Sequence, residues 1–495
     1  MIKNKSLKIV VLTLLILIGS AFFRFASAFQ IRAVLRSEIP EAEITPPADT
    51  NNNDNSSTSS TPSRVRTIIR SQIPEKEILP DADNSDKIFL FSDSGADDLF
   101  SWDSVFEKVK VVDFDSSILF SENNNSLSKK NTDTEAILPI DGIDYRITRE
   151  KIEVRDADDF TWFGKVEGSP YLSHFAVVNN RVAGEIWLPN GEHRSLLPRS
   201  EQTFLVEWND EEISRGLIDD QILISSFIST NEPGGRTGPR IQRRLSSLVC
   251  PKGEEMIWEK PILFLYDSTA LDWAGGDKDA LSALAQTHAD SINNVNLNSL
   301  MENYRVKVAA VHEFEYTSSG NLVADLQVLI DSGENEGGEV RSLMQKIGAV
   351  EASLMIGATN GRYYGMASGN ILQPPGGRYH AGVIAGGSSR AFVHEDGHNN
   401  GCGHQVGYIP DSAARPFAHG WIKDEAGMDV MAAWSQELCP TGRCWYIPLL
   451  STPHVLVSGG EIGLTGTPAG VAGEAECASI LPEAYTAFGV LPMCK

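Results

Sequence analysis

The residues from 388 to 405 read SSRAFVHEDGHNNGCGHQ. Ser388 is a good helix N-cap, and Gly401 can take the positive φ that ends a helix and turns the chain back. The stretch therefore predicts a helix that begins near Ser388 and ends at Gly401. On that helix His394 and His398 are four residues apart, so both imidazoles project from one face toward a single point.

A third imidazole completes a metal-binding pattern. His404 follows the predicted turn and returns toward His394 and His398. Three protein ligands leave one coordination position for water, which is typical of a catalytic rather than a structural zinc site. Glu395 adjoins the first ligand and is placed to take a proton from that water. The pattern predicts one Zn²⁺ ion held by the three histidines, with Glu395 as general base.

The chain before this helix alternates between strand-like and helix-like patterns from residue 261 onward. Strands are predicted at 262–266, 306–314, 353–357, 363–367 and 381–385, and helices at 277–297 and 340–347. This alternation indicates an α/β (α+β) domain in which helices pack on a twisted mixed sheet. Residues 363–367 form the expected edge strand above the histidines, where an extended peptide can pair by strand addition.

Residues 88–220 show short strand patterns instead. The clearest are at 160–166, 175–178 and 181–188, with turn signals at Asn179-Asn180 and Asn190-Gly191. We expect a small antiparallel β domain without a chemically active cluster.

A polar linker containing Pro and Gly follows at residues 231–244 and ends in a basic cluster that includes Arg243 and Arg244. Processing proteases cut exposed basic linkers, so this cluster predicts a maturation site. An Arg-rich linker that is never cut has the same composition.

The N-terminus has the pattern of a signal peptide over residues 1–28. Lysines precede an apolar run at residues 9–23, and Ala26-Ser27-Ala28 supplies a small-x-small cleavage site. The run is shorter than the ~20 residues that span a bilayer, so no stable membrane span is expected. Secretion is the favoured destination. The alternatives are an uncleaved N-terminal anchor and delivery to another compartment derived from the endomembrane system.

An internal repeat follows the signal sequence. Residues 31–49 and 65–83 are similar, and a tract rich in Asn, Ser and Thr separates them. Such a tract cannot bury enough apolar surface to order itself, so residues 29–87 are predicted to be a disordered linker region. The repeat is either a docking motif for a partner or a duplicated linker without one.

Composition narrows the function classes. A chain of 495 residues is expected to form two or more domains, and 41% hydrophobic residues suffice for a core. The net charge of −24 argues against nucleic acid or an anionic membrane surface as partner. The acidic cluster at residues 272–279 is either a calcium site, which nothing else supports, or solvated surface.

All six cysteines lie in the second half of the chain, which suggests disulfides formed in an oxidising compartment. Cys439 and Cys444 are predicted to pair, because the residues between them include Pro440 and Gly442 and can form a tight loop. Cys250 is expected in a disulfide, or alternatively as an inhibitory thiolate on the zinc of the precursor.

The string from His394 to His404 resembles the metzincin clan of zinc proteases. Its Gly397 and Asn399 match the fuller motif of the reprolysin or adamalysin branch and of bacterial peptidyl-Asp metalloendopeptidases. Gln405 stands where reprolysin-type enzymes usually have Asp, so the subfamily stays open.

The resemblance implies a Met-containing turn beneath the metal. Met431 in Asp429-Val-Met-Ala-Ala is the candidate, and Met428 is the second choice. Farther downstream, Cys439-Pro440, Cys444, Ser451-Thr-Pro453 and Gly463 look similar to the C-terminal part of the bacterial members. The β-rich region resembles their propeptides.

These features together predict a secreted zinc-dependent endopeptidase that is made as a zymogen and cuts proteins or peptides through a zinc-activated water. The expected organisation is a signal peptide (1–28), the repeat-containing linker region (29–87), a β-rich propeptide (88–244) and a metzincin-like catalytic domain (245–495). Two alternatives remain: a zinc-binding pseudoprotease, and an adhesion or binding protein that works through the N-terminal repeat.

Overall fold

The computed structural model divides the chain into two compact units, residues 1–62 and 63–495. It describes residues 66–69, 89–91, 106–115, 119, 135–156, 158–208, 250–357, 364–372, 376–384, 388–408, 413–435, 437–441, 444–459, 461–464, 466 and 475–495. The predicted signal peptide, the first copy of the repeat and the Arg243–Arg244 cluster lie outside the described residues.

A nine-stranded antiparallel sheet forms the β region. In spatial order its strands are β2 (Phe89–Phe91), β3 (Phe106–Phe114), β10 (Gln202–Trp208), β9 (His193–Arg199), β8 (Arg181–Trp187), β7 (Ser173–Val178), β6 (Asp159–Val166), β5 (Ile143–Asp156) and β4 (Glu135–Ile140). Asn179 and Asn180 have φ of 48° and 64°, as a tight hairpin between β7 and β8 requires. The strands predicted between residues 160 and 188 are confirmed.

A second sheet mixes parallel and antiparallel strands. Its strands are β12 (Tyr304–Glu313), β11 (Met256–Tyr266), β13 (Glu351–Ile356), β15 (Tyr379–Val383) and β14 (Gly365–Ala367), with β20 (Met493–Cys494) beside β11. The first four are parallel to their neighbours, whereas β14 and β20 are antiparallel to theirs. Every residue of β13 is buried, as expected for the centre of a sheet covered on both faces.

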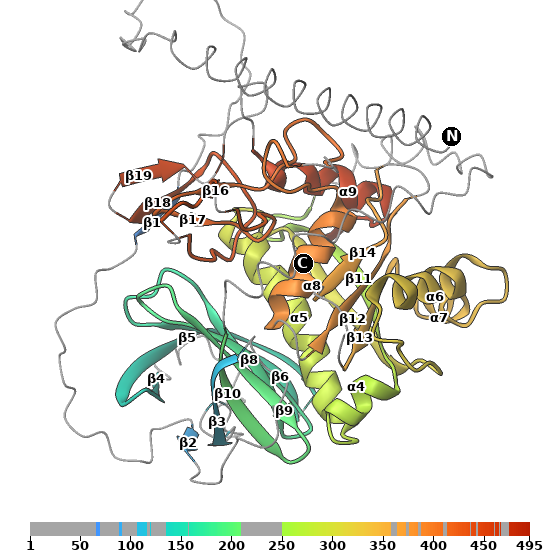
Figure 1. Cartoon of the computed structure of the whole chain (residues 1–495), viewed down its shortest axis with the longest axis horizontal. Helices are drawn as coiled ribbons and strands as arrows, with labels where there is room; N and C mark the ends of the chain where they lie inside the picture. Colours follow the sequence, from blue (N-terminus) through green and yellow to red (C-terminus); the bar gives the residue numbers. More distant parts are fainter. Residues whose placement is uncertain are drawn as a thin grey trace, which may run out of the picture. The chain divides into compact units, whose positions relative to one another are not determined.

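Helices pack on both faces of this sheet. They are α4 (Ser268–Trp273), α5 (Lys278–Asn298), α6 (Leu322–Glu334), α7 (Glu339–Ile347), α8 (Ser388–Asn400) and α9 (Leu481–Ala487), which the 3₁₀ helix η6 (Cys477–Ile480) precedes. In Figure 1, α5 and α8 lie on one side of the sheet and α6 and α7 on the other. The mixed α/β architecture agrees with the prediction, and α8 covers the predicted helix between Ser388 and Gly401.

Two small sheets complete the described structure. One contains β1 (Arg66–Ile69), β18 (Val455–Gly459) and β19 (Glu461–Leu464), and the other contains β16 (Ile422–Lys423) and β17 (Gly427–Met428). Residues 66–69 thus differ from the prediction of a linker without regular structure. Their Thr and two Ile residues favour an extended strand, and β1 pairs in parallel with β18.

One cluster of buried side chains joins the β region to the second half of the chain. A single cluster of buried side chains contains Trp187 and Phe204 of the β region together with Leu284 and Val295 of α5. A second cluster lies wholly within the β region and includes Trp162 and Phe175, so this region also has a core of its own. None of the helices among the described residues is long and apolar enough to cross a bilayer.

Polar side chains on one face of α5 contact the β region. The hydroxyl of Thr161 donates to the Asp290 carboxylate at 2.7 Å, and Asn294 Nδ2 lies 3.0 Å from His174 Nδ1. Asp290 and Asn294 are four residues apart and so share a helix face. This face is polar but buried, which explains why the helix lacks a clear apolar stripe in sequence.

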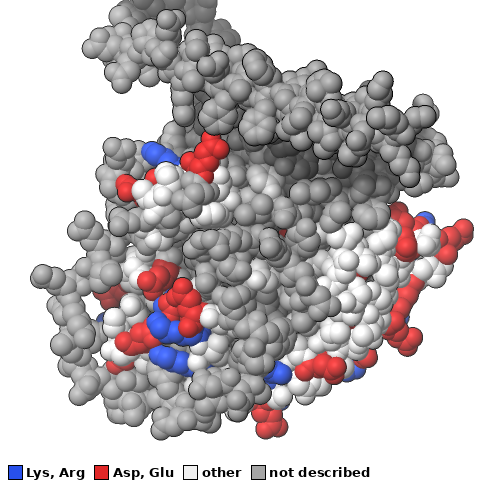
Figure 2. All heavy atoms as spheres, in the orientation of Figure 1, with Lys and Arg blue, Asp and Glu red and all other residues white. Residues whose placement is uncertain are grey.

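Charged side chains are unevenly distributed on the surface. Figure 2 shows acidic side chains along the edge where α6 and α7 lie, while acidic and basic side chains are mixed over the β region. Exposed ion pairs such as Lys110–Asp141 and Arg146–Glu135 account for part of that mixture. Exposed pairs of this kind contribute little to stability.

Asp290→Asn is expected to stabilise the chain at alkaline pH. Burial raises the pKa of Asp290 to about 7, whereas its pKa in an unfolded chain is about 3.9. The neutral Asp290 carboxyl therefore adds to the stability of the folded chain fully only below that unfolded pKa. This contribution is lost as the pH rises toward 7. Asn stays neutral, so the variant should melt several degrees above wild type at pH 8 and close to it at pH 4. Equal differences at both pH values would contradict the assignment.

Candidate metal centre

Helix α8 presents two different polar faces, and both are buried. His394 and His398 lie on one face, and Asp396, Asn399 and Asn400 lie on the opposite face. A helix with polar residues all round is unusual in a core and needs polar partners on both sides. The structure supplies a histidine cluster on the first side and a buried ion network on the second.

The three predicted ligands converge. Nε2 of His394 lies 3.1 Å from Nε2 of His404 and 3.0 Å from Nε2 of His398, and all three rings are buried. His404 arrives from the turn at Gly401, whose φ is 102°. Within the described residues these histidines form a group that can hold a metal ion.

Backbone carbonyls orient two of the rings. His394 Nδ1 lies 2.6 Å from the carbonyl oxygen of Val430, and His398 Nδ1 lies 2.8 Å from that of Cys402. A carbonyl only accepts, so each Nδ1 carries the proton and each neutral ring keeps its lone pair on Nε2. This arrangement is typical of metal-ligating histidines.

The donor set fits a small divalent cation. The lone pairs of His394 and His398 face each other across 3.0 Å, which is repulsive unless a cation lies between them. Tetrahedral zinc with Zn–N bonds of 2.0–2.1 Å places its ligand atoms about 3.3 Å apart. The observed separations are close to that value.

Glu395 points toward the edge strand β14. A Cβ atom added at Gly365 would overlap the carboxylate of Glu395. Glycine at this position of β14 therefore leaves the space that the Glu395 side chain fills. The sequence contains Gly365, but only the fold brings it against the helix.

The turn that contains Met431 packs against α8, the helix that carries His394 and His398. The sulfur of Met431 packs so close to α8 that a Cβ atom at Gly397 would overlap it. Asp429 accepts hydrogen bonds from the backbone N–H groups of Met431 and Ala432 at 3.1 and 2.9 Å. Burial raises the pKa of Asp429 to about 7 despite these donors. Met428, the second choice, lies in β17 with a separate cluster around Cys439.

Gln405 connects the third ligand to this turn. Its side-chain Oε1 accepts a hydrogen bond from the N–H of Ala433 at 2.9 Å. Gln405 follows His404 directly and Ala433 is two residues after Met431, so one bond holds the two segments together. The residue that departs from the resembled family is thus buried and hydrogen bonded here.

A buried ion network holds the opposite face of α8. Lys260 of β11 is fully buried and donates to Glu351 at 2.6 Å, to Asp396 at 2.5 Å and to the Asn400 side-chain oxygen at 3.1 Å. The His380 ring lies 2.9 Å from the Glu351 carboxylate. These contacts fix the rotation of α8 relative to the sheet.

The network sets the charges of its members. Burial disfavours the ammonium of Lys260, but the neighbouring Asp396 and Glu351 outweigh it and raise the pKa of Lys260. Burial also opposes ionisation of Glu351, yet Lys260 and His380 lower its pKa to about 2. The pKa of Asp396 is raised, mainly by burial and also by the nearby Glu351 charge.

All six cysteines are in disulfides, which join Cys250 to Cys494, Cys402 to Cys477 and Cys439 to Cys444. The thiolate alternative for Cys250 does not hold here, because its sulfur is bonded to Cys494. Cys439 and Cys444 lie near Asp424 in a group with metal-ligand spacing, but a disulfide sulfur is not a thiolate ligand.

In the acidic cluster at residues 272–279, Asp277 makes structural contacts. Asp277 caps the N-terminus of α5, accepting from the N–H groups of Asp279 and Ala280, and pairs with Arg181 of the β region. Among the described residues, no group of metal-ligand spacing includes it.

Comparisons with known proteins give only weak likenesses. No family model and no curated protein matches the chain. A chain from a solved chaperone–substrate complex is 13% identical, with a TM-score of 0.36. The match covers 63% of this chain and 48% of that chain, which is about half of its length. Metalloproteinase-II from Bacteroides fragilis is 12% identical with a TM-score of 0.34, over 65% of this chain and 88% of its own. Scores this low assign neither a fold nor a function.

Lys260→Met is expected to destabilise the chain by about 3–5 kcal/mol, because it leaves the Glu351 and Asp396 carboxyls buried without their cation. Urea unfolding at pH 7 measures the loss. A triple variant with Glu351→Gln and Asp396→Asn removes the unpaired charges and should recover much of it. An unchanged urea midpoint in Lys260→Met would show that the network does not hold the helix.

Proposed function

We propose that this chain is a zinc-dependent endopeptidase with a metzincin-type site. The observation that carries the proposal is the convergence of the three Nε2 atoms of His394, His398 and His404. Two of these rings have their Nδ1 atoms on backbone carbonyls, which directs the Nε2 lone pairs inward. Three such ligands leave a coordination position for water or substrate.

Glu395 supplies the proton chemistry. When bound, zinc would polarise the scissile carbonyl and lower the pKa of a water molecule. Glu395 accepts the proton of the attacking water and delivers it to the leaving amine. Its side chain fits this role because it follows the ligand His394 directly and lies against β14.

Strand β14 is the proposed binding edge for the substrate. Among the described strands it pairs with β15 alone, so its other edge can accept an extended peptide by strand addition. A peptide paired there runs past the Glu395 carboxylate, which adjoins Gly365. Pairing through backbone groups suits protein or peptide substrates.

We propose further that the chain is exported and made as a precursor. The pattern over residues 1–28 is that of a signal peptide, and three disulfides suit an oxidising compartment. The β region is the proposed propeptide, and Arg243 and Arg244 mark the proposed cut. The repeat at residues 31–49 and 65–83 remains a proposed docking segment.

Glu395→Gln and His398→Ala are expected to fail in different ways. Glu395→Gln keeps the side chain's size but removes the base, so zinc stays bound while turnover of a peptide substrate falls at least 10²–10⁴-fold. His398→Ala leaves two ligands and should lose the metal itself. Zinc content by atomic absorption and peptidase assays on the matured protein separate the two.

Outcomes of that comparison decide between function classes. Near-normal activity of Glu395→Gln would refute the mechanism. Wild-type protein that binds zinc but cuts nothing after maturation would replace the proposal with a zinc-binding pseudoprotease. Absence of zinc binding by wild type would overturn the metal site as a whole.

Maturation is expected to leave an N-terminus near Leu245. The basic cluster before it ends a polar linker, where a processing protease has access. N-terminal sequencing of the active form tests this, with Arg243→Ala/Arg244→Ala as the matched uncleaved control. A fully active form that begins before residue 200 would exclude it.

A further inference from the structure

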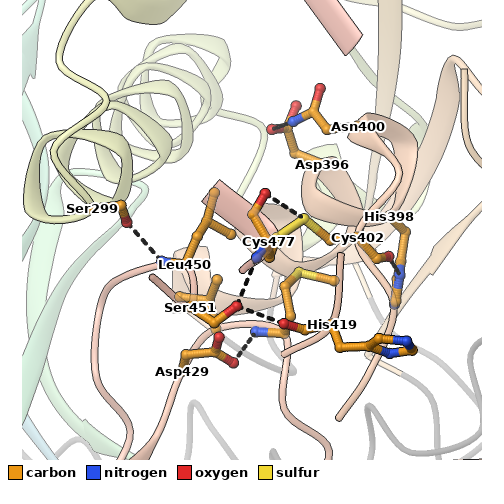
Figure 3. Close-up of a disulfide and its surroundings, with 12 residues drawn as sticks. Ser299, Asp396, His398, Asn400, Cys402, His419, Asp429, Leu450, Ser451 and Cys477 are labelled. Carbon is orange, nitrogen blue, oxygen red and sulfur yellow. Dashed lines mark hydrogen bonds between the residues drawn. A yellow bond between two sulfur atoms is a disulfide. The ribbon is translucent and has the colours of Figure 1, made fainter. Parts of the chain in front are cut away.

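The Cys402–Cys477 disulfide lies next to the proposed metal centre. Cys402 belongs to the segment that joins His398 to His404. Cys402 follows Gly401 at the end of α8, and Cys477 begins η6 near the C-terminus. Both residues are buried. Figure 3 shows His398 to the right of the disulfide, with Ser451 and His419 below it.

One connection runs from the disulfide to His398. The backbone carbonyl of Cys402 accepts the hydrogen bond from His398 Nδ1 at 2.8 Å (Figure 3). The position of that carbonyl depends on Cys402, whose side chain is covalently fixed to Cys477. The disulfide therefore restrains the acceptor that orients the second ligand.

A second connection runs from Cys477 to His404. The N–H of Cys477 donates to Ser451 Oγ at 2.8 Å, and Ser451 Oγ donates to the carbonyl of His419 at 2.5 Å. His419 Nδ1 in turn lies 2.9 Å from the carbonyl oxygen of His404. Each step is buried, so water does not compete for these groups.

The segment around Ser451 is itself anchored to the scaffold. The N–H of Leu450 donates to Ser299 Oγ at 2.8 Å, at the C-terminal end of α5 (Figure 3). The N–H of Ala478 donates to the carbonyl of Ser451 at 3.1 Å. Cys477 is thus fixed in position, and both of its connections act on the ligands as rigid supports.

We propose that the Cys402–Cys477 disulfide, Ser451 and His419 are positioning residues that hold His398 and His404 in the geometry required for tight metal binding. This inference rests on the metal-binding role proposed above for the three histidines. Residues that orient metal ligands typically contribute 10–100-fold to metal affinity.

The test measures zinc affinity of the full-length chain by competition with a chromophoric chelator. The variants are Cys402→Ala/Cys477→Ala, Ser451→Ala and His419→Ala. Each is expected to weaken zinc binding by about 10–100-fold. Asn can place an N–H near the position of His Nδ1, so His419→Asn should recover most of the affinity lost in His419→Ala. The visible spectrum of the Co²⁺-substituted protein reports any change in ligand geometry.

Cys250→Ala/Cys494→Ala is the matched control. That disulfide spans 244 residues of sequence against 75 for Cys402–Cys477, so its removal should cost more stability of the metal-free chain. Thermal unfolding of the metal-free variants measures that cost. A purely structural role predicts that affinity loss follows stability loss. The positioning role predicts the reverse order, with zinc affinity unchanged in the control.

Two results are decisive. If wild type binds zinc tightly and the Cys402–Cys477, Ser451 and His419 variants bind it equally well, the positioning role is refuted while the proposed metal site stands. If wild type itself does not bind zinc, the proposed function fails first. Ser451→Ala keeps all three disulfides, so it tests the second connection even where the cysteine variant does not fold.

Discussion

Three imidazole nitrogens lie close together in a buried site, and backbone carbonyls direct the lone pairs of two of them inward. Nε2 of His394 is 3.0 Å from that of His398 and 3.1 Å from that of His404. The lone pairs of His394 and His398 repel each other at this distance unless a cation lies between them. Such a cluster persists only where the surrounding structure over-determines it. The supports come from segments far apart in sequence: the turn at Val430, the carbonyl of Cys402 and the contact from His419.

The helix that carries His394 and His398 is held by an ion network on its opposite face. Lys260, Glu351 and Asp396 form a buried ion network that links β11, β13 and α8. Such networks add little net stability compared with an apolar core, although removing one partner is costly. Here the network holds the rotation of α8 that points His394 and His398 at His404. Gly397 and Gly365 complete the fit by leaving room for Met431 and Glu395.

The β region is part of the same body. Its strands pack on α5, and the Thr161–Asp290 and His174–Asn294 contacts are buried between them. If the linker at residues 231–244 is cut, as we propose, the two pieces share an interface that combines apolar area with specific polar contacts. That face of α5 is polar, so water can solvate it if the β region leaves.

Several features that depend on local spacing could be predicted from the sequence alone. The interval between His394 and His398, the turn at Gly401 and the hairpin at Asn179-Asn180 follow from backbone periodicity, and the structure reproduces each of them. The alternation of strands and helices likewise indicated a mixed α/β architecture. Local rules did not assign α6, although Leu322, Leu326 and Leu329 carry its helical spacing.

Which distant residues contact the histidine cluster depends on the tertiary structure. Lys260 stands in a largely apolar strand, which indicates that it has polar partners. The same holds for Asn399 and Asn400. The sequence does not show which residues those partners are. Ser451, His419 and Cys477 lie 15 to 73 residues beyond His404 in sequence, and no periodicity connects them to it. Their contacts exist because burial leaves each donor and acceptor only its neighbours in the fold as partners, and those neighbours depend on how the whole chain packs.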